Sequence, residues 1–156
     1  MNMKRKMNKM LCGLLMMGAV AVGTSCKDDD KPAAASLYTR LGGIDAISAV
    51  TDKFISNVGA DEVINEKFGA TVADPYRLEA FRNNLVDQIC AGAGGPCQYK
   101  GKTMATAHAG MGISDAEFTA LVNDLVSALN SFSVPEKEKT DLLAILGPMK
   151  TDIVGK

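Results

Sequence analysis

The sequence predicts an all-α domain, on three observations. Apolar residues recur every three or four positions from residue 44 onward, which places them on one face of a helix. No stretch sustains the alternation of apolar and polar residues that is typical of a half-buried strand. Two helix starts are marked, one by Ser114 and Glu117 and one by Ser133 and Glu136, at the spacing at which side chains cap a helix N-terminus. A bundle of short helices satisfies all three.

Residues 1–26 are predicted to be a lipoprotein signal peptide and not part of the fold. Four basic residues lie among the first nine, and the apolar run that follows, 11–23, is too short to span a bilayer comfortably. Small residues then stand directly before Cys26, as at the cleavage site of a lipid-modified cysteine. We therefore expect a lipid on Cys26, which would anchor the protein at the bacterial cell envelope, on the periplasmic or the surface face of the outer membrane. The alternative is a secreted protein that is cut near Ser25.

Residues 27–36 are predicted to be an acidic, flexible tether, because they combine charged residues with Pro32 and small residues. Removal of the signal peptide takes away four of the 17 Lys and Arg residues and none of the 18 Asp and Glu residues, which leaves a net charge of −5. An acidic chain is a poor partner for nucleic acid, so we expect none. The membrane is then contacted only through the lipid.

The elements expected after the tether follow from the apolar spacing and from the positions of glycine and proline. They are a short apolar turn at 37–41 closed by Gly42 and Gly43, a helix that starts just beyond and ends at Gly59, a helical piece at 61–68, a loop at 69–75, a helix through Ile89, a glycine-rich loop at 91–101, a short helix ending at His108, a helix after Ser114, and a last helix whose inner face runs from Leu142 to Ile153.

The chain contains one histidine, His108, which limits its metal chemistry. Zinc and copper sites with several histidines are excluded, whereas haem iron needs only one, because the porphyrin supplies four nitrogens. Covalent attachment of the c type is excluded because no Cys-x-x-Cys-His run is present. Met104 lies one turn before His108, so both project from the same side of a helix, where a flat apolar macrocycle can lie. From the residues alone, an ordinary structural histidine remains the alternative.

Four motifs, in order, resemble those of the group 1 truncated haemoglobins. They are Leu37-Tyr38-x-x-Leu41-Gly42-Gly43, then Gly94-Gly95-Pro96-x-x-Tyr99-x-Gly101, then Met104-x-x-x-His108-x-Gly110 followed by Gly112-Ile113, and finally Val134-Pro135 with Pro148. The resemblance extends from Leu37 to about Val154 and implies a truncated globin domain at 37–156. It implies a globin-like fold, a two-over-two helical sandwich around b-type haem, with His108 as the proximal ligand of the iron.

The resemblance also implies the residues that line the haem pocket. Phe68 would stack against the haem, and Phe81 and Leu85 would line its distal side. The remaining positions would approach from the first long helix or border the proximal side, and they are Phe54, Ile55, Tyr99, Met104, Ile113 and Phe118. For each residue taken alone, ordinary core packing is the alternative.

Two positions depart from the better-known members of that family. Ile55 stands where many have a tyrosine, and Leu85 where a glutamine is frequent, so the pocket is expected to lack its usual hydrogen-bond donors. Tyr76, Arg82 or Asn84 would have to turn inward to replace them. One hydrogen bond is worth ~1 kcal/mol, somewhat less than tenfold in affinity, so we expect looser dioxygen binding and weaker discrimination against carbon monoxide.

Cys90 and Cys97 lie across the glycine-rich loop. An exported protein meets oxidants, so we expect a disulfide between them. A structural staple is favoured over a redox switch, because no neighbouring residue in the sequence stands out as lowering the pKa of either thiol.

The function expected from the resemblance is reversible binding of dioxygen, as in oxygen transport, or of nitric oxide or carbon monoxide. The first alternative is enzymatic, either oxidation of nitric oxide or peroxidase-type detoxification. It would require a separate reductase, because no flavin or nicotinamide domain is found in the sequence. The second alternative is a haemless helical lipoprotein with a structural or interaction role.

Overall fold

The computed structural model describes residues 34–156, so the predicted signal peptide and nearly all of the tether lie outside the described residues. The described part is helical, which confirms the predicted fold class. Its elements are α1 (Leu37–Arg40), α2 (Gly43–Ala60), α3 (Asn65–Val72), α4 (Pro75–Gly92), α5 (Met104–His108), α6 (Asp115–Ser131), α7 (Glu136–Leu146) and the 3-10 helix η1 (Gly147–Asp152). Within residues 34–156, none of these helices is both long and apolar enough to cross a membrane.

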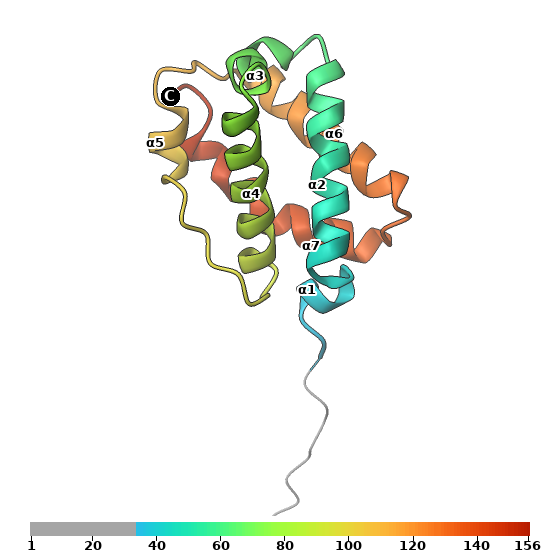
Figure 1. Cartoon of the computed structure of the whole chain (residues 1–156). Helices are drawn as coiled ribbons and strands as arrows, with labels where there is room; N and C mark the ends of the chain where they lie inside the picture. The colour runs from blue at the N-terminus through green and yellow to red at the C-terminus, as the bar shows by residue number, and fades with distance from the viewer. Residues whose placement is uncertain (1–33) are drawn as a thin grey trace, which may run out of the picture. The chain divides into compact units, whose positions relative to one another are not determined.

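Two helices, α2 and α4, lie side by side, and α6 packs across α2 from behind (Figure 1). The short α3 packs against both α2 and α4 and joins them at one end. At the other end Arg40 ties α1 to α7 through ion pairs with Glu138 and Asp141, at 2.8 and 2.5 Å. The five-residue α5 lies to one side and packs against η1. Residues 104–108 therefore sit beside the C-terminal segment and outside the main helical layers.

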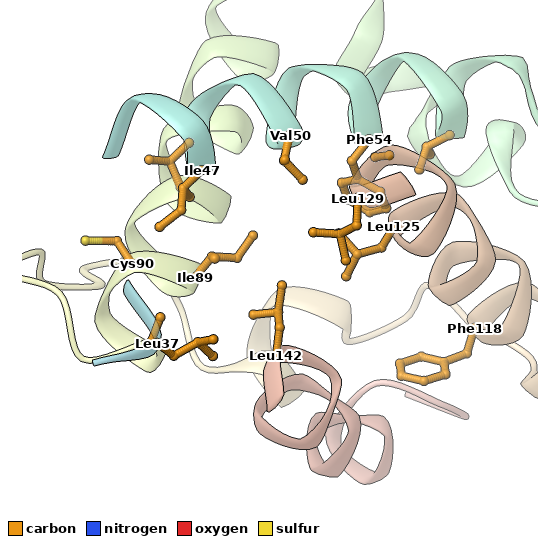
Figure 2. Close-up of a cluster of buried hydrophobic side chains, with 14 of the residues drawn as sticks. Leu37, Ile47, Val50, Phe54, Ile89, Cys90, Phe118, Leu125, Leu129 and Leu142 are labelled. Carbon is orange, nitrogen blue, oxygen red and sulfur yellow. The ribbon is translucent and has the colours of Figure 1, made fainter. Parts of the chain in front are cut away.

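The core lies where α2, α4, α6 and α7 meet, and it is closed. Figure 2 shows Ile47, Val50 and Phe54 of α2 pointing toward Leu129 of α6 and Leu142 of α7. Leu129 and Leu142 are each 1% exposed. The void that remains among these side chains is about 10 Å³, roughly the space of a single water molecule. These side chains are therefore packed closely against one another.

The predicted loop at 69–75 is wrong. Helix α3 continues to Val72, because Gly69 sits in it without strain, and α4 starts at Pro75, so the connection is only Ala73 and Asp74. Asp74 accepts hydrogen bonds from the backbone nitrogens of Tyr76 and Arg77, and a proline at the first helical position costs no hydrogen bond. The helical piece expected from Asp61 begins instead at Asn65, because the Asp61 carboxylate accepts from the Val63 nitrogen and forms a turn.

The second predicted capping box, at Ser133 and Glu136, is also wrong. Ser133 has φ +53° and its nitrogen donates to the Asn130 oxygen, so it closes α6 in the left-handed conformation that often follows a helix. Pro135 is the residue before α7, and no side chain caps that helix. The last helix ends at Leu146, since Pro148 cannot donate a backbone hydrogen bond, and the chain tightens into η1.

The loop after α4 is folded tightly against its surroundings. Cys90 and Cys97 form the expected disulfide. The Gly95 nitrogen donates to the Cys90 oxygen, and the Tyr38 nitrogen donates to the Ala93 oxygen, both at 2.8 Å. A Cβ at Gly95 would lie 2.5 Å from the Tyr38 ring and 2.7 Å from the Cys90 sulfur. Position 95 therefore requires glycine, because the Tyr38 ring and the Cys90 sulfur lie too close for a Cβ.

We predict that Gly95→Ala destabilises the protein by ~1–3 kcal/mol, because an added methyl group overpacks a rigid site. Gly59→Ala is the matched control: its Cβ would meet nothing within 4 Å in α2, and it should stabilise the helix by ~0.5–1 kcal/mol. Urea unfolding of the purified chain measures both free energies. Equal effects of the two substitutions would contradict the packing described here.

Candidate functional site

His108 is the last residue of α5 and is half-buried. Its Nδ1 lies 2.8 Å from the backbone oxygen of Met104, one turn earlier. A carbonyl oxygen can only accept, so Nδ1 carries the proton and donates it. With the proton on Nδ1, Nε2 is the nitrogen that can offer a lone pair, and the hydrogen bond at the other nitrogen orients it. This is how metal-binding histidines are held in proteins.

The segment after His108 is held by the C-terminal residues. The Gly112 nitrogen donates to the Lys156 oxygen at 2.7 Å, and the Gly155 nitrogen donates to the Ile113 oxygen at 2.9 Å. Ile113 and Val154 thereby form an isolated parallel bridge. Gly110 has φ +80° and Gly112 has φ +59°, a conformation that side-chain-bearing residues rarely adopt. The C-terminal pairing thus fixes where the chain leaves α5.

Helix α3 holds the same segment from the other side. Lys67 donates to the Met111 oxygen at 2.9 Å, and its Nζ lies 3.5 Å from a carboxylate oxygen of Glu117. Glu117 also accepts from the Ser114 nitrogen, while the Ser114 hydroxyl accepts from the Glu117 nitrogen, which confirms the first predicted capping box. The hydrogen bond from the Ser114 backbone is the main reason why the pKa of Glu117 is lowered.

Half-buried apolar side chains gather on α3, α4 and α5. The rings of Phe68 on α3 and Phe81 on α4 lie 5.4 Å apart between centroids and are tilted by 49°. Leu85 lies one turn along α4 from Phe81, and Met104 lies on α5, one turn before His108. Unlike the residues of the closed core, these four side chains are only partly covered. They offer the apolar surface that a flat ligand needs.

The other predicted pocket residues lie in different surroundings. Phe54, Ile113 and Phe118 are 5%, 5% and 9% exposed and belong to the buried core, where Figure 2 shows Phe118 apart from the residues of α2. Ile55 lines a surface cleft of about 300 Å³, whose walls come from α2 and α4. Tyr99 donates its hydroxyl to the Lys102 oxygen and stays within its own loop, where burial raises its pKa. Their contact with a cofactor stays a prediction.

None of the three polar residues proposed to turn inward does so. Tyr76 is 84% exposed, and Asn84 is exposed as well. Arg82 is held by Asp52 through two hydrogen bonds, of 2.5 and 2.9 Å, at the cleft that Ile55 lines. The Arg82 guanidinium lowers the pKa of that carboxyl.

Sequence reasoning missed Gln88. Its Nε2 lies 3.5 Å from the sulfur of Met104 and 3.2 Å from the sulfur of Met149. The residue lies three positions after Leu85 and seven after Phe81, so it shares their face of α4. That spacing was the available signal.

The donor set fits haem. Among residues 34–156 no three His, Cys, Asp or Glu side chains come close enough together to hold a metal ion. What the described part offers is one imidazole with a free nitrogen beside an apolar, aromatic surface. Such a set suits an iron that brings its other four ligands in a porphyrin.

Comparison with known families identifies the group. Residues 36–154 match the family model described as bacterial-like globin. This chain is a bacterial-like globin. It is 30% identical over 119 residues to the group 1 truncated haemoglobin of Mycolicibacterium paratuberculosis, a match that covers 76% of this chain and 84% of that protein. A group 1 truncated haemoglobin of Tetrahymena pyriformis is 29% identical over 121 residues, which cover 78% of this chain and 96% of that protein.

Solved structures agree with the sequence comparison. The Fe(III) form of truncated haemoglobin from Tetrahymena pyriformis has a TM-score of 0.71 and 27% identity, and the match covers 78% of this globin and all of that chain. The cyanomet 2/2 haemoglobin of Synechococcus sp. PCC 7002, with covalently attached haem, has a TM-score of 0.70 and 28% identity, with the same coverage. The globin therefore has the two-over-two helical fold, uses haem as its cofactor and binds diatomic gases.

We predict that Glu117→Gln lowers the melting temperature of the protein at pH 7 and that this difference disappears in acid. The folded-state pKa of Glu117 lies below its ordinary value of 4.5. The stabilisation is therefore complete above that value and is lost as the pH falls through the folded pKa. Thermal melts of both proteins between pH 7 and pH 3 measure it, with the exposed Glu62→Gln as control. A constant difference across that range would contradict the assignment.

Proposed function

We propose that His108 is the proximal ligand of the haem iron and that the globin binds a diatomic gas reversibly. The observation that carries this proposal is the hydrogen bond from His108 Nδ1 to the Met104 oxygen. It fixes the tautomer and orients Nε2 toward a metal, and it makes the imidazole a better donor to iron. Haem, when bound, supplies an iron centre with one position left for the gas.

The other side chains hold the macrocycle and exclude water. Phe68, Phe81 and Leu85 would cover it from α3 and α4, and Met104 would cover it from α5. Covering these four side chains removes apolar surface from water, which contributes ~25 cal/mol for each Å² buried. Haem binding is therefore expected to raise the stability of the globin as well as to create the gas site.

The affinity of the His108 imidazole for iron should depend on the hydrogen bond that its Nδ1 donates. The acceptor is the backbone oxygen of Met104, so this hydrogen bond survives substitution of the Met104 side chain. We predict that the His108→Ala variant does not bind one haem per chain, or that the Soret band of its reduced, carbon monoxide-exposed form differs strongly from that of the wild type. Met104→Leu, which keeps side-chain volume and the backbone oxygen, should keep one haem per chain with at most a weaker affinity. Absorption spectra after hemin titration decide between them. A wild-type spectrum in His108→Ala would refute the assignment.

An enzymatic role shares this site and is separated from gas carriage by one assay. If the globin oxidises nitric oxide, it must be supplied with electrons, and we propose that a separate reductase supplies them. Catalytic consumption of nitric oxide with an added electron donor would establish that role. Consumption of one equivalent only would favour a carrier or a sensor.

We further propose that the globin is a lipoprotein anchored through Cys26 at the bacterial cell envelope. The basic start of the chain, the apolar run and the small residues before Cys26 support this. The disulfide between Cys90 and Cys97 supports it independently, because disulfides persist in oxidising compartments and are rare in the cytosol.

We predict that Cys26→Ala moves the protein from the membrane fraction to the soluble or unprocessed pool and abolishes the incorporation of labelled palmitate. Cys12→Ala is the matched control, because Cys12 lies inside the predicted signal peptide and should change neither. Labelling of growing cells followed by fractionation measures both. Palmitate incorporation that survives in Cys26→Ala would exclude this anchor.

A further inference from the structure

Lys67 is a half-buried lysine on α3, directly before Phe68. Its ammonium group reaches out of α3 and donates to the backbone oxygen of Met111 at 2.9 Å, 44 positions further along the chain. Met111 belongs to the segment 109–114, which connects α5 to α6 (Figure 1). A side chain of the helix that carries Phe68 therefore holds the backbone just after His108.

This contact leads to the imidazole through further hydrogen bonds. The Met111 nitrogen donates to the His108 oxygen at 3.0 Å, while the Met111 oxygen accepts from Lys67. The His108 Nδ1 in turn donates to the Met104 oxygen at 2.8 Å. A continuous series of hydrogen bonds thus runs from the Lys67 ammonium group to the ring nitrogen that orients Nε2.

The segment after His108 has little stiffness of its own. Gly110 and Gly112 both have a positive φ, and a glycine backbone loses more conformational freedom on ordering than that of any other residue. The Gly112 nitrogen is held by the Lys156 oxygen at 2.7 Å. Because the order of this segment must come from contacts with other parts of the chain, the contact from Lys67 matters for where His108 lies.

Lys67 is itself held by Glu117 of α6. Its Nζ lies 3.5 Å from Oε1 of that carboxylate, while Oε2 accepts from the Ser114 nitrogen at 2.7 Å. The carboxylate therefore divides its two oxygens between the lysine and the capping box. The side chains of Lys67 and Glu117 are 29% and 18% exposed, so water only partly surrounds them. A hydrogen bond from an ammonium group is stronger than one between neutral groups, and Glu117 keeps this donor beside the Met111 oxygen.

We infer that Lys67 is a positioning residue for the proximal ligand: by fixing Met111, it keeps His108 in the orientation that binds iron. This inference rests on the proposed function. Because Phe68 adjoins Lys67, the same lysine ties the helix that would cover the macrocycle to the segment that follows its ligand. Lys67 acts through Met111 and is not a ligand of the iron.

The test uses the full chain loaded with haem and compares Lys67→Met with wild type. In the reduced, gas-free protein, we expect the iron–histidine stretching frequency to fall, because the Nδ1 hydrogen bond that makes the imidazole a better donor is held less firmly. We expect hemin to pass to a scavenger about fivefold faster, the effect of one ordinary hydrogen bond. Hydrogen exchange at the Met111 amide should also be faster.

Two further variants show whether the donor itself is responsible. Lys67→Arg keeps the charge and a donor, so it should bring all three quantities back toward the wild-type values. Lys53→Met is the matched control: Lys53 is exposed on α2, so the same substitution there should change none of them.

The outcomes separate this inference from the proposed function. Wild-type protein that binds no haem would refute the proposed function and the inference together. Normal haem binding with wild-type frequency, hemin loss and amide exchange in Lys67→Met would overturn the inference alone, as would changes that are equally large in Lys67→Arg. If Lys67→Met takes up no haem, Lys67→Gln, which stays polar but reaches less far, is measured in the same way. A lowered frequency that Lys67→Arg restores supports the inference.

Discussion

The site depends on the hydrogen bond from His108 Nδ1 to the Met104 oxygen, which exists only while α5 is helical. A helix of five residues is not stable in isolation, because fixing the backbone of the first turn costs more free energy than the hydrogen bonds of one turn contribute. Its geometry must come from what surrounds it. The Cys90–Cys97 disulfide anchors the preceding loop, Lys67 holds the Met111 oxygen, and the C-terminal residues pair with the segment after His108. These distant contacts together position one imidazole.

Helix α4 serves the core and the site with different faces. Ile89 and Cys90 are buried in the core, where the void among the side chains of α2, α4, α6 and α7 is about 10 Å³. Phe81, Leu85 and Gln88 lie on a face that is only partly covered. Stability and ligand binding are thus separated on a single element. Substitutions in the core are expected to act on folding, whereas under the proposed function substitutions on the other face act on haem binding.

Local chemistry explains which parts of the fold could be predicted from the sequence. The end of α5 at His108 and the capping box of Ser114 and Glu117 depend on residues within one turn, so the pattern was sufficient. Ser133 does not cap α7, because it closes the preceding helix α6 with a positive φ. Gln88 escaped notice for a different reason. Periodicity places it on a face of α4, but only the packing of η1 beside α5 shows that two sulfurs receive its amide.

The disulfide acts as a staple, as its surroundings show. Cys90 is fully buried, and its backbone oxygen also accepts from the Gly95 nitrogen, so the disulfide and this hydrogen bond hold the same loop. Closing a loop of this length contributes ~2–3 kcal/mol by removing disorder from the unfolded chain. The disulfide therefore stabilises the loop that leads into α5. An oxidising compartment therefore favours the arrangement that holds His108, which links the predicted export of the chain to the geometry of its haem site.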